Sequence, residues 1–106
     1  MNKMRRKAIR NLIAKLSGIR NDKKDVDFDL IDDILDETQT ILDDEEDYFY
    51  NIPENLQSGS RYDDSENAID NLGDAINELS DIDAECSQEY IKECIDNAID
   101  SLNNCI

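Results

Sequence analysis

The sequence has few of the residues that usually carry catalytic or metal chemistry. Its 106 residues include no His, no Trp, one Pro, three Gly and three Cys. Without His there is no imidazole base and no mixed Cys/His metal site, and neither a Gly-rich phosphate loop nor a nucleophile motif is present. The three thiols are an odd number with spacings typical of neither disulfide frameworks nor zinc sites. We therefore expect no enzyme activity, no cofactor and no metal. We interpret the thiols as small buried or half-buried side chains in segments of helical spacing: Cys86, Cys94 and Cys105.

Long apolar runs are also missing. The longest apolar stretches have three residues, such as Leu12 to Ala14, whereas a membrane-spanning helix needs about 20. The basic N-terminus is not followed by the apolar segment of a secretory signal. We expect no membrane contact by a spanning helix, and a location in the cytoplasm.

Basic residues are almost confined to the first 24 positions. That segment holds nine Lys and Arg residues and one acid, for a net charge of +8, whereas the following 82 residues hold two bases and 26 acids, for a net charge of −24. A body this anionic repels nucleic acid and attracts proteins that bind nucleic acid. The composition therefore favours a protein-binding function without direct nucleic-acid binding by the acidic part.

The apolar residues recur with helical spacing throughout, which predicts an all-α protein. We expect one domain with a basic helix in residues 1–24, an acidic helix in 25–51, a loop in 52–62 and an acidic helical arm in 63–106. Ser17-Gly18 predicts a stop for the first helix, because Gly commonly ends helices. Asp25 or Asp27 can cap the start of the second helix. Asp63 and Glu66 have the spacing of a capping box at the start of the helical arm.

The simplest architecture is a long antiparallel helical hairpin in which residues 2–51 lie against 63–105. Breaks at 18–26 and 80–87 would divide it into four helical segments, and both Ser80 and Ser87 can serve as caps at the second break. The hairpin would set the basic helix beside the acidic C-terminal one, so that a free basic arm is disfavoured. Because two helices leave one side of the apolar face open, we also expect a homodimer that closes a bundle.

One short acidic pattern bears on cation binding. Asp25, Asp27 and Asp29 alternate as at the start of a calcium loop, but Leu30 takes the place of the required Gly and Asp36 that of the closing Glu. An acidic helix start explains the pattern better.

Most of the sequence resembles a known group of proteins. Met-Asn-Lys followed by Arg5-Arg6-Lys7, the turn Asn51-Ile52-Pro53-Glu54 after an acidic helix, and the Ala-Ile-Asp-Asn-Leu stretch at 68–72 are similar to small acidic helical proteins of phages and mobile elements in Firmicutes. The resemblance implies a phage protein acting inside a bacterium, and brings no assigned activity. The group has an uninterrupted first helix, whereas this chain carries Ser17-Gly18.

The density of carboxylates suggests mimicry of nucleic acid. Residues 25–47 contain 12 acids in 23 positions, or one per roughly 2.9 Å of helix, against about 3.4 Å for a single DNA strand. We hypothesise an inhibitor that occupies the nucleic-acid-binding surface of a host protein, for instance a defence effector. The contact residues would be Asp32, Asp33, Asp36, Glu37, Asp43, Asp44, Glu46 and Asp47, with Tyr48, Tyr50 and Tyr62 either an aromatic contact patch or a hydrophobic plug at the turn.

Two alternatives remain open. The protein could be a structural or assembly coiled coil that pairs through its apolar residues, its charges only excluding wrong partners. The basic helix 3–20 could instead meet a membrane surface or nucleic acid.

Overall fold

The computed structural model describes residues 2–21 and 26–106 and consists of helices joined by short connections. In chain order these are α1 (Lys3–Asn21), α2 (Phe28–Tyr50), the 3-10 turn η1 (Glu54–Leu56), α3 (Ser60–Ser80) and α4 (Gln88–Asn103). No strand occurs in the described ranges. The prediction of an all-α fold with four helical segments is confirmed.

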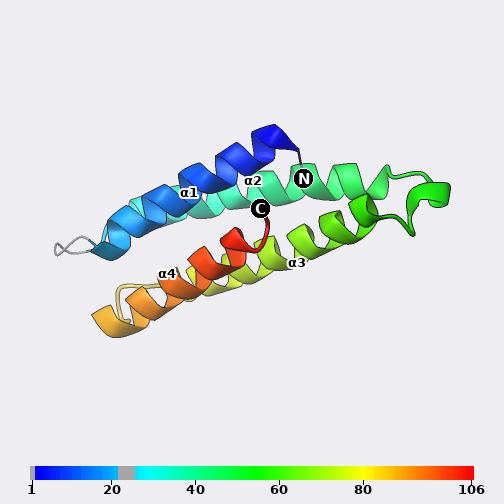
Figure 1. Ribbon diagram of the computed structural model, residues 1–106. Coiled ribbons are helices and arrows are strands. Elements are labelled where there is room, and N and C mark those ends of the chain that lie inside the picture. Colours follow the sequence, from blue (N-terminus) through cyan, green and yellow to red (C-terminus); the bar gives the residue numbers. More distant parts are fainter. Residues whose placement is uncertain (1, 22–25) are drawn as a thin grey trace.

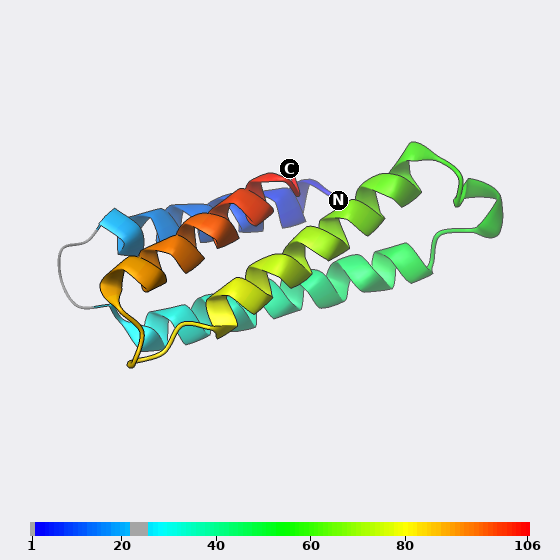
Figure 2. The same cartoon turned by 90° about the horizontal axis from the view of Figure 1, so that it is seen from below.

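The four α-helices run alternately up and down and pack as a bundle about 51 Å long (Figure 1). Each helix contacts its neighbour in the chain, and α4 closes the ring by packing against α1 (Figure 2). The expected contact between the basic helix and the C-terminal acidic helix is therefore present. The two arms of the hairpin are each folded back on themselves, so the bundle closes within one chain.

This closure changes the argument for a dimer. All four helices turn their apolar stripes towards a common interior, so no long apolar face of a two-helix hairpin remains open. Dimerisation stays a prediction, but it needs a different physical reason from the one that the hairpin supplied.

The helix ends follow the sequence in two places. Asp27 is the N-cap of α2 and accepts the Leu30 backbone N–H at 3.2 Å, and Ser87 caps α4 through the Tyr90 backbone N–H at 3.1 Å. The second candidate cap of α2, Asp25, and the centre of the predicted break at 18–26 lie outside the described residues.

Two predicted helix ends are wrong. α1 continues through Gly18 to Asn21, because Ile19 packs against the core and Arg20 pairs with Asp96 of α4. α3 begins at Ser60 with Gly59 as its N-cap, so Asp63 lies in the first turn and forms no capping box. In both cases tertiary contacts or a nearby turn outweigh a local signal.

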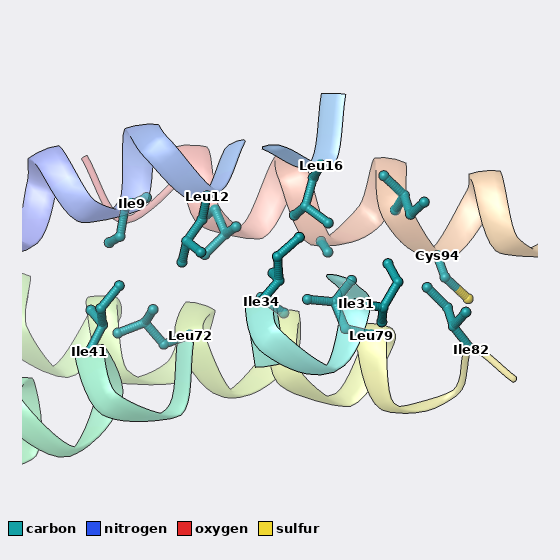
Figure 3. Packing of buried hydrophobic residues seen from close by; sticks show 14 of the residues in the cluster. Ile9, Leu12, Leu16, Ile31, Ile34, Ile41, Leu72, Leu79, Ile82 and Cys94 are labelled. Carbon is teal, nitrogen blue, oxygen red and sulfur yellow. The ribbon is translucent and has the colours of Figure 1, made fainter. Parts of the chain in front are cut away.

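The interior is a continuous column of Ile, Leu and Ala side chains (Figure 3). Ile9, Leu12 and Leu16 of α1 meet Ile34 of α2 and Leu72 of α3, and all five are fully buried. Burial of such side chains contributes roughly 1.5–3 kcal/mol each, which stabilises the bundle despite its excess of negative charge. None of the described helices is long and apolar enough to cross a membrane.

Candidate functional site

The eight acidic residues that the sequence singled out all lie on α2. Seven are exposed, and Glu46 is half-buried. Glu37 forms an exposed ion pair with Lys15 of α1 at 3.0 Å, and Asp43 accepts a hydrogen bond from Gln39. The remaining exposed members are Asp32, Asp33, Asp36, Asp44 and Asp47.

The spacing of α2 explains why these side chains face outward. Its buried positions are Ile31, Ile34, Thr38, Ile41 and Glu45, which recur at steps of three and four and form one stripe. At 3.6 residues per turn, the carboxylates fall on the other faces of the helix. One stripe borders α1 and consists of Glu37, Thr40 and Asp44. A second stripe, apart from the first, consists of Asp32, Asp36 and Asp43.

A second acidic helix lies beside the first. α3 packs against α2 in the antiparallel direction and exposes five carboxylates of its own: Asp63, Asp64, Glu66, Asp70 and Asp74. α2 carries no basic residue and α3 only Arg61. With Asp29 included, α2 exposes eight acids, and α3 exposes five. Along about 34 Å of helix this is one carboxylate per roughly 2.6 Å, a spacing between those of the charges in single-stranded and duplex DNA.

The aromatic residues at the α2–α3 end divide into packed and exposed ones. Tyr62 lies against Phe49 with ring centroids 4.6 Å apart, which fits a plug at the turn. Tyr50 touches the edge of Phe49 but is 75 % exposed, and Tyr48 is 37 % exposed. Only Tyr50 is therefore largely available for contact with a partner.

A buried carboxylate joins three helices, and the sequence interpretation did not identify it. Glu45 of α2 is fully buried; its Oε2 accepts a hydrogen bond from Arg5 Nε of α1 at 2.7 Å, and its Oε1 accepts one from Ser65 Oγ of α3 at 2.9 Å. The Arg5 guanidinium also lies 5.5 Å from the centre of the Tyr48 ring. The signal was present, because a Glu within an apolar stripe needs a cation and a hydrogen-bond donor when the stripe is buried.

The positive helix α1 is only partly neutralised by its neighbours. Arg5, Lys15 and Arg20 pair with acids of α2 or α4. The exposed side chains of Lys3, Lys7 and Arg10 make no ion pair with the part of the chain that the structure describes. One helix face therefore presents positive charge on an otherwise anionic molecule.

The three thiols are free. Burial, with a smaller effect from the negative charge of Glu45, raises the pKa of Cys105 to about 12, and burial also raises the pKa of Cys94. Both thiols therefore stay protonated at neutral pH, which makes them poor nucleophiles. Within residues 2–21 and 26–106, no group of three or more Cys, Asp or Glu side chains could hold a metal ion.

The chemistry of this site is thus electrostatic: an acidic surface over α2 and α3 beside one basic helix. Its residues alone support a functional proposal. Comparison of the chain with protein-family models, with curated proteins and with solved structures finds no match.

Proposed function

We propose that this protein binds another protein, acting as an inhibitor that occupies a basic, nucleic-acid-binding surface with the outer faces of α2 and α3. The observation that carries the proposal is the pairing of two antiparallel helices whose exposed carboxylates are spaced like the phosphates of nucleic acid. The resemblance to phage proteins would make the target a bacterial host protein, such as a defence effector, and the location the host cytoplasm.

The bundle supports this function through its rigidity. The acidic helices are fixed by a buried core, so their charges are in place before the partner arrives. Binding therefore does not have to order the backbone of these helices, which lowers its entropic cost. The like charges repel one another in the free protein, and a cationic groove would relieve that repulsion. Binding should therefore weaken steeply as salt rises, since exposed charges are screened over about 10 Å at 0.1 M.

The test reverses four charges on the acidic face. Asp32→Lys and Asp43→Lys on α2 are combined with Glu66→Lys and Asp70→Lys on α3, all at exposed positions. Wild type and variant are immobilised and exposed to bacterial lysate at low salt, and captured proteins are challenged with duplex DNA. We expect DNA to release the partner from wild type, and the variant to capture none of it.

A matched control carries the same change in net charge elsewhere. Glu85, Glu89, Glu93 and Asp100 lie on or just before α4, are exposed, and can each be replaced by Lys. This control should keep the partner. Capture that survives both the α2–α3 reversal and excess DNA would refute the proposal and favour association through apolar residues.

A further inference from the structure

The face formed by α1 and α2 carries opposite charges side by side. Lys3 and Lys7 are exposed on α1, and Asp44 and Asp47 are exposed on α2. Within the described residues, none of these four side chains forms an ion pair. A basic stripe and an acidic stripe therefore lie next to each other, each without a counter-charge of its own.

Between the two stripes runs an open groove of about 620 Å³. Its lining includes Met4, Ala8 and Ala14 of α1 and Ile41 of α2. Met4 is 80 % exposed, more than any other large apolar side chain of the described residues. α1 and α2 also pack against each other less extensively than the other neighbouring α-helices do.

We propose that this face binds a second copy of the chain, in a dimer whose twofold axis runs along the groove, parallel to the helices. Such a rotation places α1 of each copy over α2 of the other, so each basic stripe meets an acidic stripe at both symmetry-related contacts. A twofold axis across the helices would instead stack α1 on α1 and α2 on α2. The charges select the first arrangement and oppose the second.

The register of the stripes fits this axis. Arg5 lies level with Glu45 and Lys15 level with Glu37, as their ion pairs show. Positions on α1 and α2 at one height therefore have numbers that add to about 50–52, which brings Lys7 level with Asp44 and Lys3 level with Asp47. Because rotation about an axis parallel to the helices preserves height, these residues become partners across the interface without any sliding of one copy.

The apolar residues of the groove add to the same contact. Met4 lines the groove beside the axis, so Met4 of one copy comes to lie against Met4 of the other. Ala8 and Ala14 are small, which allows the two α1–α2 faces to approach closely. Repulsion between two chains of net charge −16 opposes association over long distances, but moderate salt screens it more than it screens contacting pairs.

The test uses two variants that should fail alone and succeed together. One carries Lys3→Glu and Lys7→Glu, and the other Asp44→Lys and Asp47→Lys. By sedimentation equilibrium at about 0.15 M salt, wild type should show twice the 12.2 kDa chain mass. Each variant alone should dimerise at least about a hundredfold more weakly, because symmetry makes four contacts repulsive. Their equimolar mixture should form a heterodimer, since both contacts are attractive again: one keeps the wild-type signs and the other has its signs exchanged.

A control and a milder pair of variants guard against trivial explanations. Asp70→Lys with Asp74→Lys makes the same charge change on α3 and should leave the dimer intact. Lys7→Gln and Asp44→Asn should each weaken it without adding repulsion. Wild type that stays monomeric up to about 1 mM, the range of weak association, would overturn the proposal. A mixture of the charge-reversed variants that remains monomeric, while far-UV circular dichroism shows both folded, would overturn it as well.

Asp44 and Asp47 of the dimer face also belong to the acidic contact set, whereas the functional test reverses Asp32 and Asp43 on α2 with Glu66 and Asp70 on α3. Loss of the dimer is read from Lys3→Glu with Lys7→Glu, a variant that leaves every acid of α2 and α3 in place, so it can be distinguished from loss of the partner.

Discussion

Replacing Arg5 should show how far the free energy of unfolding falls when the buried Glu45 carboxylate loses the paired guanidinium. In Arg5→Met, Glu45 stays fully buried next to Ser65 but loses the 2.7 Å hydrogen bond and the charge of the guanidinium. Breaking a buried pair by removing one partner costs about 3–5 kcal/mol. The Arg5 side chain is 15 % exposed, so we expect the lower end, about 3 kcal/mol.

The assay is thermal and urea unfolding followed by circular dichroism. For 106 residues, an unfolding entropy of about 2.1 cal/mol/K per residue converts about 3 kcal/mol into a fall in Tm of about 13 °C. Lys3→Met removes an exposed charge from the same helix and should change stability by less than about 0.5 kcal/mol. Arg5→Lys should lower stability by less than Arg5→Met does, because an ammonium keeps the charge but not the planar donor geometry.

A double-mutant cycle separates the ion pair from the packing of its members. Arg5→Met combined with Glu45→Met removes both charges and fills the same space with apolar atoms. The double variant should therefore be clearly more stable than the sum of the single effects predicts, by at least about 1 kcal/mol. Additive effects, or a cost below about 1 kcal/mol for Arg5→Met alone, would refute the view that Glu45 depends on Arg5.

The remaining predictions concern the helix, the core, a thiol and salt. Gly18→Ala should stabilise the protein by about 0.5–1 kcal/mol in urea unfolding, because Gly18 lies inside α1 with a helical backbone and nothing within 4 Å of a new Cβ. A loss of stability would indicate that α1 ends at Gly18. Leu72→Ala should cost about 2–5 kcal/mol by the same measurement, since Leu72 is fully buried in the central cluster, and a cost below about 1 kcal/mol would show a loosely packed core. Alkylation of Cys105 at pH 8 should be about a thousandfold slower in the folded than in the unfolded protein, because its pKa rises from 9.0 to about 12; since only the unfolded chain then loses the proton, this residue should also lower stability as pH rises from 9 towards 12. Removal of salt at neutral pH should lower Tm, because the net charge of −16 is then unscreened, and a constant Tm would mean that α1 compensates the acids locally.

The sequence alone determined the features that depend only on residues close together in the chain. Apolar spacing in residues 28–50 and 64–80 specified helices, because the period of 3.6 residues is a local property that burial on one side makes visible. Asp27 and Ser87 could be recognised as caps because their side chains satisfy backbone donors only three residues away. The exposure of the α2 carboxylates followed from the same period.

Only the tertiary structure decided how the helices meet. Whether residues 3–21 continue in line with α2 or fold back beside it depends on contacts distant in sequence, such as Lys15 with Glu37 and Arg20 with Asp96. The same contacts carried α1 past Gly18, where a local rule predicted an end. Glu45 shows the difference most clearly: in the sequence it interrupts an apolar stripe, and in the bundle it is the point where Arg5 and Ser65 converge from other helices. Partners 40 and 20 residues away leave no periodic trace, because their proximity is created by packing and not by the geometry of one helix.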